Sequence, residues 1–445
     1  MTAASHPPVR KPFAVAAAAA LLLAGGLWAP AQPAWAQAAA PAAAASAPTV
    51  RPAFGALLQA AQAALSGGRA PEALAKLDEA AALPALTPYE TMILERTRAA
   101  AAEKQGNMAL TIKSLEAALA TGQVAADEEL GLTEVMVSLS AGEKDHARVL
   151  KWSQRYIDLK GPSDAVRLMR IQSQVASGDE RGAAAALVER VEAADKAGRP
   201  LPEPQQRLLL GLQQQAKDPA AVKTMERLAL QYPRPEYWSN VIVDAARRAG
   251  DNERATVELY RLLRATGALT SASLREGLVQ NALRAGQPVE ALTVVDEGFA
   301  AGVLGAGPDA AAHQTLREQA RKAAAADVAD RPAAEAAARR AADGNALVQL
   351  GWSMVAALPA GTAGGASAEQ GLALIEQGIA KGSLRRPAEA QLHLGIAQLA
   401  AGRKDPARQT LGALAKTAVA PEPLAEPIRL WALWAAAPPM LPKLT

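Results

Sequence analysis

The sequence has no cysteine and only four histidines among its 445 residues. The missing cysteine excludes disulfides, thiolate metal sites, cysteine nucleophiles and a lipidated N-terminal cysteine. Aromatic residues make up only 3% of the chain, which is few for β-sandwiches and β-barrels because their strands favour aromatic and β-branched side chains. The formal net charge of +3 is too small to indicate nucleic acid as a partner.

The residues that are abundant favour helices. Half of the chain is hydrophobic, and alanine supplies most of that half. This apolar content is too high for a wholly disordered chain. Because alanine, leucine, glutamate and arginine are strong helix formers, the composition predicts an all-α protein.

The N-terminus has the layout of a secretory signal peptide. Arg10 and Lys11 precede an uncharged apolar run over residues 13–29, and an Ala-Trp-Ala triplet ends at Ala36. We expect residues 1–36 to be a signal peptide that is cleaved between Ala36 and Gln37. The alternative is a membrane anchor, which needs about 20 apolar residues and usually lacks such a cleavage site.

The sequence after the signal predicts an exported protein. Residues 37–52 are low-complexity alanine and proline, which predicts a disordered linker. No later stretch is apolar enough to span a bilayer. The mature protein is therefore predicted to be periplasmic, with no integral membrane span after cleavage.

A short pattern recurs every 34 to 38 residues over most of the mature chain. A glycine or small residue is followed five positions later by a small residue and four positions after that by an apolar one, as in Gly178, Ala183 and Leu187. Such a period is the signature of a repeat array. The anchors of the pattern are Gly68, Gly106, Gly142, Gly178, Ala216, Gly250, Gly286 and Gly402.

This pattern predicts helical hairpins. A glycine at the anchor can adopt the left-handed conformation that ends the first helix. Asp or Asn directly after it suits the start of the second helix, as at Asp179 and Asn252. The small residue at the fifth position lets the two helices approach closely, and the apolar residue one turn later lies on the same face.

These residues resemble the tetratricopeptide (TPR) repeat. In the last repeat, Leu394 and Gly395 precede Gly402, Ala407 and Leu411 at the spacing that this family uses. The resemblance implies a right-handed, TPR-like superhelix, an α-solenoid of about nine to eleven helical hairpins.

The mature chain also resembles an exported family of β-proteobacterial TPR proteins that has no assigned function. The resemblance implies an exported scaffold and a link to a TonB-type transport system. It rests on residues 88–102, 232–238, 302–307, 384–404 and 429–433.

The regularity of the pattern predicts the domain organisation. Residues 53–305 are expected to form an N-terminal TPR-like array. Residues 306–371 depart from the register and are expected to form an irregular helical segment with a loop. Residues 372–445 are expected to contain further TPR-like repeats and a capping helix that carries Trp431 and Trp434.

The chain contains no motif for catalysis, for a metal or for a cofactor. His146, His313 and His393 are far apart in the order of the repeats, and none belongs to an HExxH motif. We expect His146 and His313 at the surface and His393 inside a hairpin. Tryptophans such as Trp152, Trp238 and Trp352 are expected to pack between helices and not to serve as sugar platforms. No catalytic residue, metal site or cofactor is predicted.

The concave face of the array is the predicted binding site. The TPR resemblance places positions 2, 5, 9, 12 and 13 of each repeat on this face when the anchor is position 15. A solvated inner face without a ligand would show the same mixed charges. The predicted groove residues are Arg96, Glu103, Lys104, Tyr237, Asn240, Asp244, Arg247, Arg248, Glu276, Gln280 and Arg284.

The functional hypothesis is a non-enzymatic periplasmic scaffold. Its concave face would bind another envelope protein or a peptide segment, and no nucleic acid. Two alternatives stay open: a cell-wall-acting enzyme or accessory factor that uses residues 306–371, and a structural array that self-associates through Trp431 and Trp434. The sequence leaves the oligomeric state open.

Overall fold

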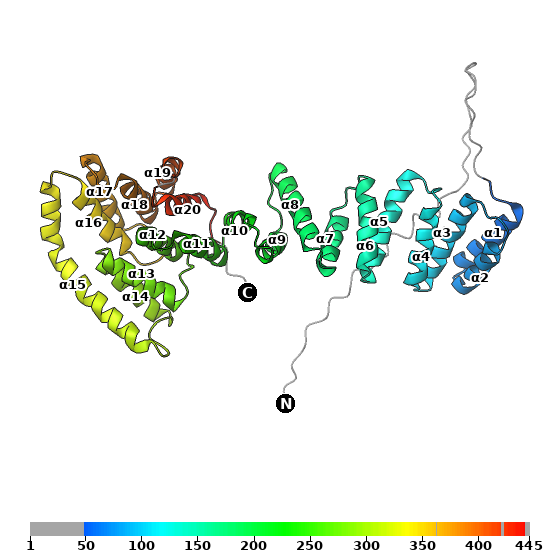
Figure 1. The fold of residues 1–445 in the computed structure, drawn as a ribbon, viewed down its shortest axis with the longest axis horizontal. Coiled ribbons are helices and arrows are strands. Elements are labelled where there is room, and N and C mark those ends of the chain that lie inside the picture. Colours follow the sequence, from blue (N-terminus) through cyan, green and yellow to red (C-terminus); the bar gives the residue numbers. More distant parts are fainter. Residues whose placement is uncertain (1–48, 362, 420–421, 441–445) are drawn as a thin grey trace, which may run out of the picture. The chain divides into compact units, whose positions relative to one another are not determined.

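The computed structural model describes residues 49–361, 363–419 and 422–440, and this part of the chain is all-α, as predicted. It contains twenty helices and no strand (Figure 1). None of the described helices is long and apolar enough to cross a bilayer. The predicted signal peptide, its cleavage site between Ala36 and Gln37 and most of the predicted linker 37–52 lie outside the described residues.

The chain divides into two compact units, Met1–Ala186 and Leu187–Thr445, which we call unit 1 and unit 2. The boundary falls within helix α8 (Glu180–Lys196). In unit 1, consecutive helices pack as antiparallel hairpins, α1 on α2, α3 on α4 and α5 on α6. The helices of unit 1 before α8 are α1 (Pro52–Ser66), α2 (Ala70–Ala81), α3 (Pro88–Lys104), α4 (Met108–Ala120), α5 (Ala126–Gly142), α6 (His146–Asp158) and α7 (Asp164–Ala176).

The repeat pattern accounts for the hairpin turns. Gly106 and Gly178 adopt φ of 71° and 78°, the left-handed conformation expected of a helix-ending glycine. At two anchors a lysine takes this conformation instead, Lys144 after Gly142 and Lys217 after Ala216. The following Asn or Asp caps the next helix, since Asn107 Oδ1 accepts the backbone N–H of Leu110 at 3.0 Å.

The small and apolar repeat positions form the seam of each hairpin. Ala183 and Leu187 have no exposed surface, and the same holds for Ala73 and Leu77 in the first hairpin. Alanine at this position allows close approach of the two helices, and leucine fills the layer below it. The periodic part of the sequence therefore determines the local packing.

A buried carboxylate links the start of α1 to α3. Glu90 has no exposed surface and accepts hydrogen bonds from Arg51 Nε at 2.9 Å and from the backbone N–H of Thr87 at 3.0 Å. Thr87 in turn caps α3, which completes a capping box. The guanidinium of Arg51, together with these backbone donors, lowers the pKa of Glu90 to about 2. Arg51, within the predicted linker, thus takes part in the fold.

We predict a pH-dependent loss of stability from Glu90. Because its folded pKa lies below its ordinary value of 4.5, its contribution is present above that value and is lost as the pH falls toward 2. The Glu90→Gln variant should therefore melt at a lower temperature than the wild type at pH 7, and most of this difference should be lost at pH 2.5. Circular dichroism melts at both pH values test this. An unchanged difference between the two pH values would contradict it.

Unit 2 contains five hairpins and one long connecting helix. The pairs α9–α10, α11–α12, α13–α14, α16–α17 and α18–α19 pack as hairpins. The 31-residue helix α15 includes Pro332 and runs along the outside of unit 2 from α14 to α16 (Figure 1). The helices after α8 are α9 (Glu203–Gln215), α10 (Ala220–Gln231), α11 (Pro235–Ala249), α12 (Glu253–Ala265), α13 (Ala272–Arg284), α14 (Pro288–Ala300), α15 (Ala310–Arg340), α16 (Asn345–Ala356), α17 (Ala366–Lys381), α18 (Pro387–Ala400), α19 (Lys404–Thr417) and α20 (Ala425–Ala436).

Glycines set the closest helix pair of this unit, α16 and α17. A Cβ added to Gly351 would lie 2.4 Å from the carbonyl oxygen of Gly371, and one added to Gly344 would lie 1.8 Å from that of Gly378. Neither carbonyl can move without moving its helix. Residues 345–381, which begin inside the segment 306–371 that departs from the repeat register, therefore form a hairpin, through glycine in place of alanine.

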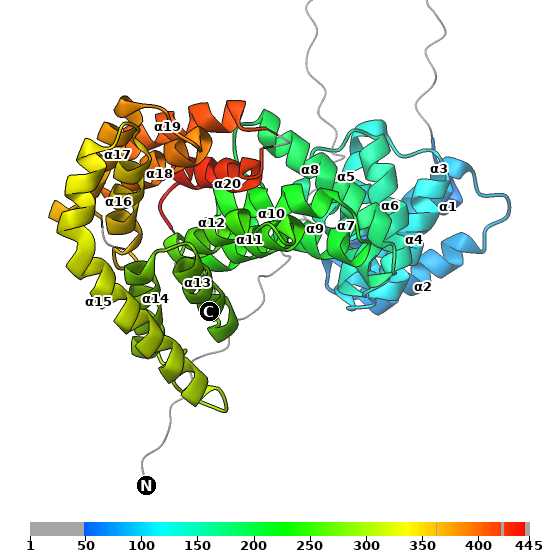
Figure 2. The same ribbon diagram turned by 60° about the vertical axis from the view of Figure 1, so that its left-hand side comes forward.

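The last helix returns to the middle of unit 2. Helix α20 packs on α19 and also on α12 (Figures 1 and 2). Trp431 Nε1 donates to the carbonyl of Glu258 at 3.2 Å, and Trp434 packs edge-on against Trp238 with ring centroids 5.4 Å apart. Arg429 pairs with Glu226 at 2.6 Å. Unit 2 is thus closed upon itself at its C-terminal end.

Candidate functional site

Helix α12 lies against the first helices of the C-terminal hairpins, and polar side chains make most of these contacts. Arg254 pairs with Glu389 of α18 at 2.5 Å. One turn further along α12, Glu258 contacts His393 of α18 at 3.1 Å. Arg264 donates to the carbonyl of Leu358, just after α16, at 2.7 Å. The face formed by α16, α18 and α20 therefore already holds a helix of the same chain.

A buried ionic cluster lies at the centre of this contact. Arg261 is 8% exposed and binds Glu290 of α14 in a bidentate manner, at 2.8 and 2.6 Å. Its Nη1 donates to Glu258 at 2.6 Å. His393 Nε2 lies 3.1 Å from the same Glu258 oxygen. We call Glu258, Arg261, Glu290 and His393 the central cluster.

Electrostatics favour the ionised forms of Glu258 and Arg261. Burial alone would raise the pKa of Glu258, but the adjacent Arg261 and His393 outweigh it and lower that pKa to about 2. The pKa of Arg261 is raised, because Glu290 and Glu258 outweigh the opposing effect of burial. The central cluster therefore combines a guanidinium and two carboxylates away from water.

Trp352 of α16 packs on the central cluster. Its ring stacks on His393 with centroids 3.7 Å apart and an interplanar angle of 4°, and the Arg261 guanidinium lies 4.9 Å from its centroid. Trp152 donates to Glu116, and Trp238 contacts Trp434. All three tryptophans thus take part in packing contacts, in line with the prediction.

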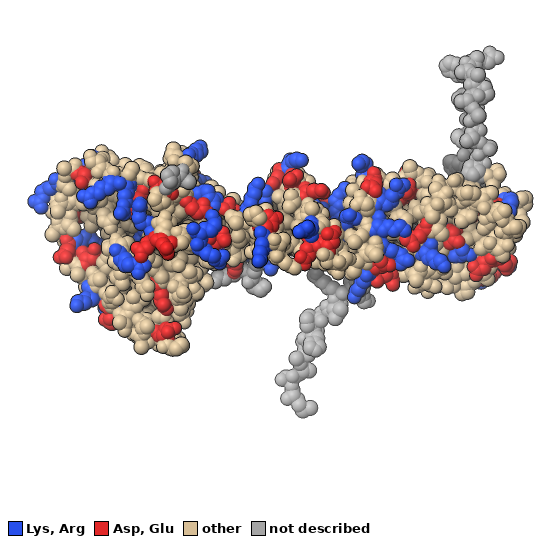
Figure 3. Space-filling view, in the orientation of Figure 1, with Lys and Arg blue, Asp and Glu red and all other residues tan. Residues whose placement is uncertain are grey.

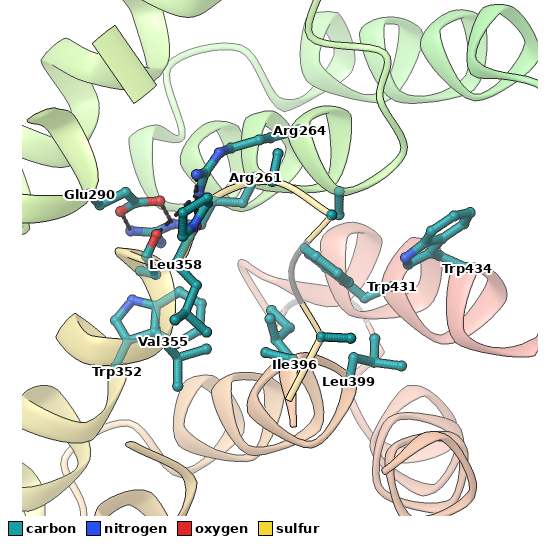
Figure 4. A pocket seen from close by; sticks show the side chains of 17 residues that line it. Arg261, Arg264, Glu290, Trp352, Val355, Leu358, Ile396, Leu399, Trp431 and Trp434 are labelled. Carbon is teal, nitrogen blue, oxygen red and sulfur yellow. Dashed lines mark hydrogen bonds and ion pairs between the residues drawn. The ribbon is translucent and has the colours of Figure 1, made fainter. Parts of the chain in front are cut away.

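An apolar cavity of about 250 Å³ lies on one side of the cluster (Figure 4). Arg261, Arg264 and Glu290 lie at one end of it, and Arg264 is held there by Glu297 of α14 at 2.7 Å. We call it the tryptophan cavity. Its apolar walls include Trp352, Val355, Leu358, Ile396, Leu399, Trp431 and Trp434.

A polar cavity of about 240 Å³ lies on the other side and shares Arg261 and Trp352 with the first. We call it the arginine cavity, because four arginines line it. They are accompanied by acids and amides that come from α12, α13, α16 and α18. Its polar lining consists of Glu253, Arg254, Glu258, Arg261, Asn281, Arg284, Gln287, Gln349, Arg386, Glu389 and His393.

The structure distributes the predicted groove residues over both units. Arg96, Glu103 and Lys104 belong to α3 of unit 1, and the other eight belong to α11 and α13 of unit 2. Arg96 pairs with Glu128 of α5 at 2.8 Å, whereas Glu103 and Lys104 are exposed. These three side chains lie on the surface formed by the first helices of unit 1.

Several predicted groove residues of unit 2 are engaged inside the unit. Tyr237 is 6% exposed, and its hydroxyl donates to Glu203 at 2.6 Å. Burial and this contact raise the pKa of Tyr237. Asp244 pairs with Arg248 at 3.0 Å, and Arg248 also reaches Glu426 of α20.

The remaining groove residues of unit 2 are more accessible. Asn240, Arg247 and Gln280 are exposed, and 76% of the Arg247 side chain is accessible. Arg284 is exposed at the mouth of the arginine cavity, 3.5 Å from Glu253. Glu276 faces His313 of α15 at 2.5 Å.

The histidines lie in three separate environments. The expectation of a surface His313 was wrong, because this residue is only 4% exposed. Its Nδ1 accepts the backbone N–H of Gly305 at 3.1 Å, so its Nε2 donates to Glu276. His146 is half-buried next to Ser173. His393 is buried, as expected, but faces α12 and not only its own hairpin.

The central cluster was not predicted from the sequence. Glu258 and Arg261 alternate with leucines in α12, and that spacing is typical of a helix with one solvent-facing side. Trp352 and His393 are uncommon residues in the C-terminal repeats and could have indicated a site there. Their spacing, however, does not predict a contact with α12.

Comparisons with known proteins add little to this description. No protein-family model and no curated protein sequence matches the chain. Among solved structures, the structure of Naa15/Naa10 bound to HypK-THB has a chain that is 13% identical, with a TM-score of 0.30. The match covers 82% of this chain but only 63% of that one, less than two thirds of its length. The helix packing described above therefore defines the class, a TPR-like array of helical hairpins.

We predict that the central cluster is essential for the stability of unit 2. In the Glu290→Gln variant, Arg261 would lose its bidentate partner while staying buried, at a cost of about 3 kcal/mol. The matched control is Glu335→Gln on α15, whose ion pair with Arg339 is half-exposed and should contribute under about 1 kcal/mol. Urea unfolding of both variants tests this. Equal losses in both would contradict a special role for the cluster.

Proposed function

We propose that the protein is a periplasmic scaffold that binds another envelope protein through the first-helix face of its hairpins. One observation carries this proposal: in unit 2, side chains of the first helices α16 and α18 and of the terminal helix α20 contact α12. The hairpin faces of this chain can therefore bind a helix with a mixed polar and apolar surface.

Unit 1 offers the equivalent face without such an occupant. Its first helices are α1, α3, α5 and α7, and within the described part of unit 1 they pack only against helices that adjoin them in the array. Arg96, Glu103 and Lys104 give this face mixed charge. Figure 3 shows acidic and basic side chains interspersed over the visible surface of unit 1. Such a face suits a polar or amphipathic segment of a partner protein.

The proposed periplasmic location and the proposed link to a transport system are based on the sequence. The signal-peptide layout of residues 1–36 supports export, and the resemblance to exported β-proteobacterial proteins supports a link with a TonB-type system. The self-association alternative relied on Trp431 and Trp434, which contact Glu258 and Trp238 inside unit 2. No contact in the described residues favours the enzyme alternative over the scaffold.

Site-specific photo-crosslinking in the source organism tests the proposal. A photoreactive amino acid placed at Lys104 on α3 or at Arg247 on α11 should crosslink to the same envelope protein. Replacing both Arg247 and Arg248 with glutamate is a poorer test. Arg248 pairs with Glu426, so its substitution would disturb unit 2.

The matched control is Lys113, which is exposed on the second helix α4. A crosslink of equal yield from Lys113 would contradict the choice of face. The absence of any discrete crosslinked protein from Lys104 and Arg247 would contradict the scaffold proposal.

A further inference from the structure

The arginine cavity combines an open, basic mouth with a buried floor. Arg284 and Arg386 are 56% and 61% exposed at the mouth, and their ion pairs are long, at 3.5 Å to Glu253 and 3.6 Å to Glu389. Arg284 also donates to Asn281 Oδ1 at 2.6 Å. Glu258 and Gln287, both 2% exposed, belong to the buried part of the lining. The cavity thus has positively charged arginines at its mouth and hydrogen-bond acceptors in its buried part.

Three residues that line this cavity each have a buried polar atom without a hydrogen-bond partner. These atoms are Glu258 Oε2, Gln287 Oε1 and Arg254 Nε. Buried polar atoms are nearly always paired in folded proteins, so an unpaired group requires an explanation. Two of these atoms are acceptors and one is a donor, and a ligand that completes the cavity must therefore carry both kinds of group.

The positions of these atoms limit the size of the ligand. Arg254 and Glu258 are four residues apart on α12, so their Cβ atoms lie on one face of the helix, about 6 Å apart. Arg254 is the nearer of the two to the N-terminal end of α12, where Glu253 and the arginines of the mouth lie. The cavity volume of about 240 Å³ is smaller than that of sites for drug-sized ligands.

We propose that the arginine cavity binds a small zwitterion of the α-amino acid class. Its ammonium group donates to Glu258 and Gln287, and its carboxylate accepts from Arg254 and Arg386. An α-amino acid carries these two charges a few ångströms apart, which fits one helical turn of α12. This small-molecule site is independent of the protein-binding face proposed above.

Simpler ligands fit the cavity less well. A lone carboxylate would pair with the arginines but leave the two buried acceptors unpaired. A lone ammonium would pair with the acceptors but would face the positive charge of Arg254 and Arg386. The tryptophan cavity is no rival for this ligand, because Arg261 and Arg264 are already paired there with Glu290 and Glu297.

Isothermal titration calorimetry of the full chain tests the proposal by comparing amino acids with half ligands, which carry only the carboxylate or only the ammonium group. The probes are glycine, L-alanine and L-glutamate, with acetate and methylammonium as the half ligands. At least one amino acid should bind with a Kd at least tenfold below those of both half ligands, a difference of about 1.4 kcal/mol. Equal affinity for acetate or methylammonium, or no binding of any amino acid, would overturn the proposal.

A pair of glutamine variants locates the binding. Gln287→Met removes the acceptor in the cavity and should raise the Kd of the best amino acid at least tenfold. Gln398→Met is the control, because Gln398 also has a buried, unpaired Oε1 but lines neither cavity, and its variant should bind as the wild type does. Circular dichroism confirms that both variants are folded. Wild-type affinity in Gln287→Met would overturn the assignment to this cavity.

Discussion

The bidentate pair between Arg261 and Glu290 is the interaction on which unit 2 depends. A guanidinium that is 8% exposed is tolerated only when its charge and its donors are satisfied. Here Glu258 comes from the same helix and Glu290 from α14, while Trp352 of α16 lies over the group. Because the partners come from different hairpins, the pair is complete in only one arrangement of α12, α14 and α16. We infer that it specifies this arrangement as well as stabilising it.

Because of this arrangement, the first-helix face of the C-terminal hairpins contacts a helix of the same chain. In a regular array the first helices line a surface that is open to a partner. In unit 2, the first helices α16 and α18 and the terminal helix α20 instead contact α12 of the same chain. The C-terminal hairpins therefore serve the internal architecture of unit 2. Exposed first-helix residues of α3, α11 and α13 include Lys104, Arg247 and Gln280.

Local features of this fold could be predicted from the sequence, and distant ones could not. The hairpin turns and seams follow from residues within one repeat, such as Gly178, Ala183 and Leu187, so their spacing is visible in the chain. The return of α20 depends on Trp431 meeting Glu258 across 173 residues, and no periodicity encodes such a contact. For the same reason Tyr237, predicted to face a groove, is buried against Glu203.

The central claim is that α12 and the C-terminal hairpins form one cooperative structure. Native-state hydrogen exchange tests it most directly, because amides that open together share one free energy of opening. Slowly exchanging amides of α12, α16 and α18 should have the same opening free energy and the same dependence on denaturant. Opening of α16 and α18 at a clearly lower free energy, with α12 still protected, would contradict it.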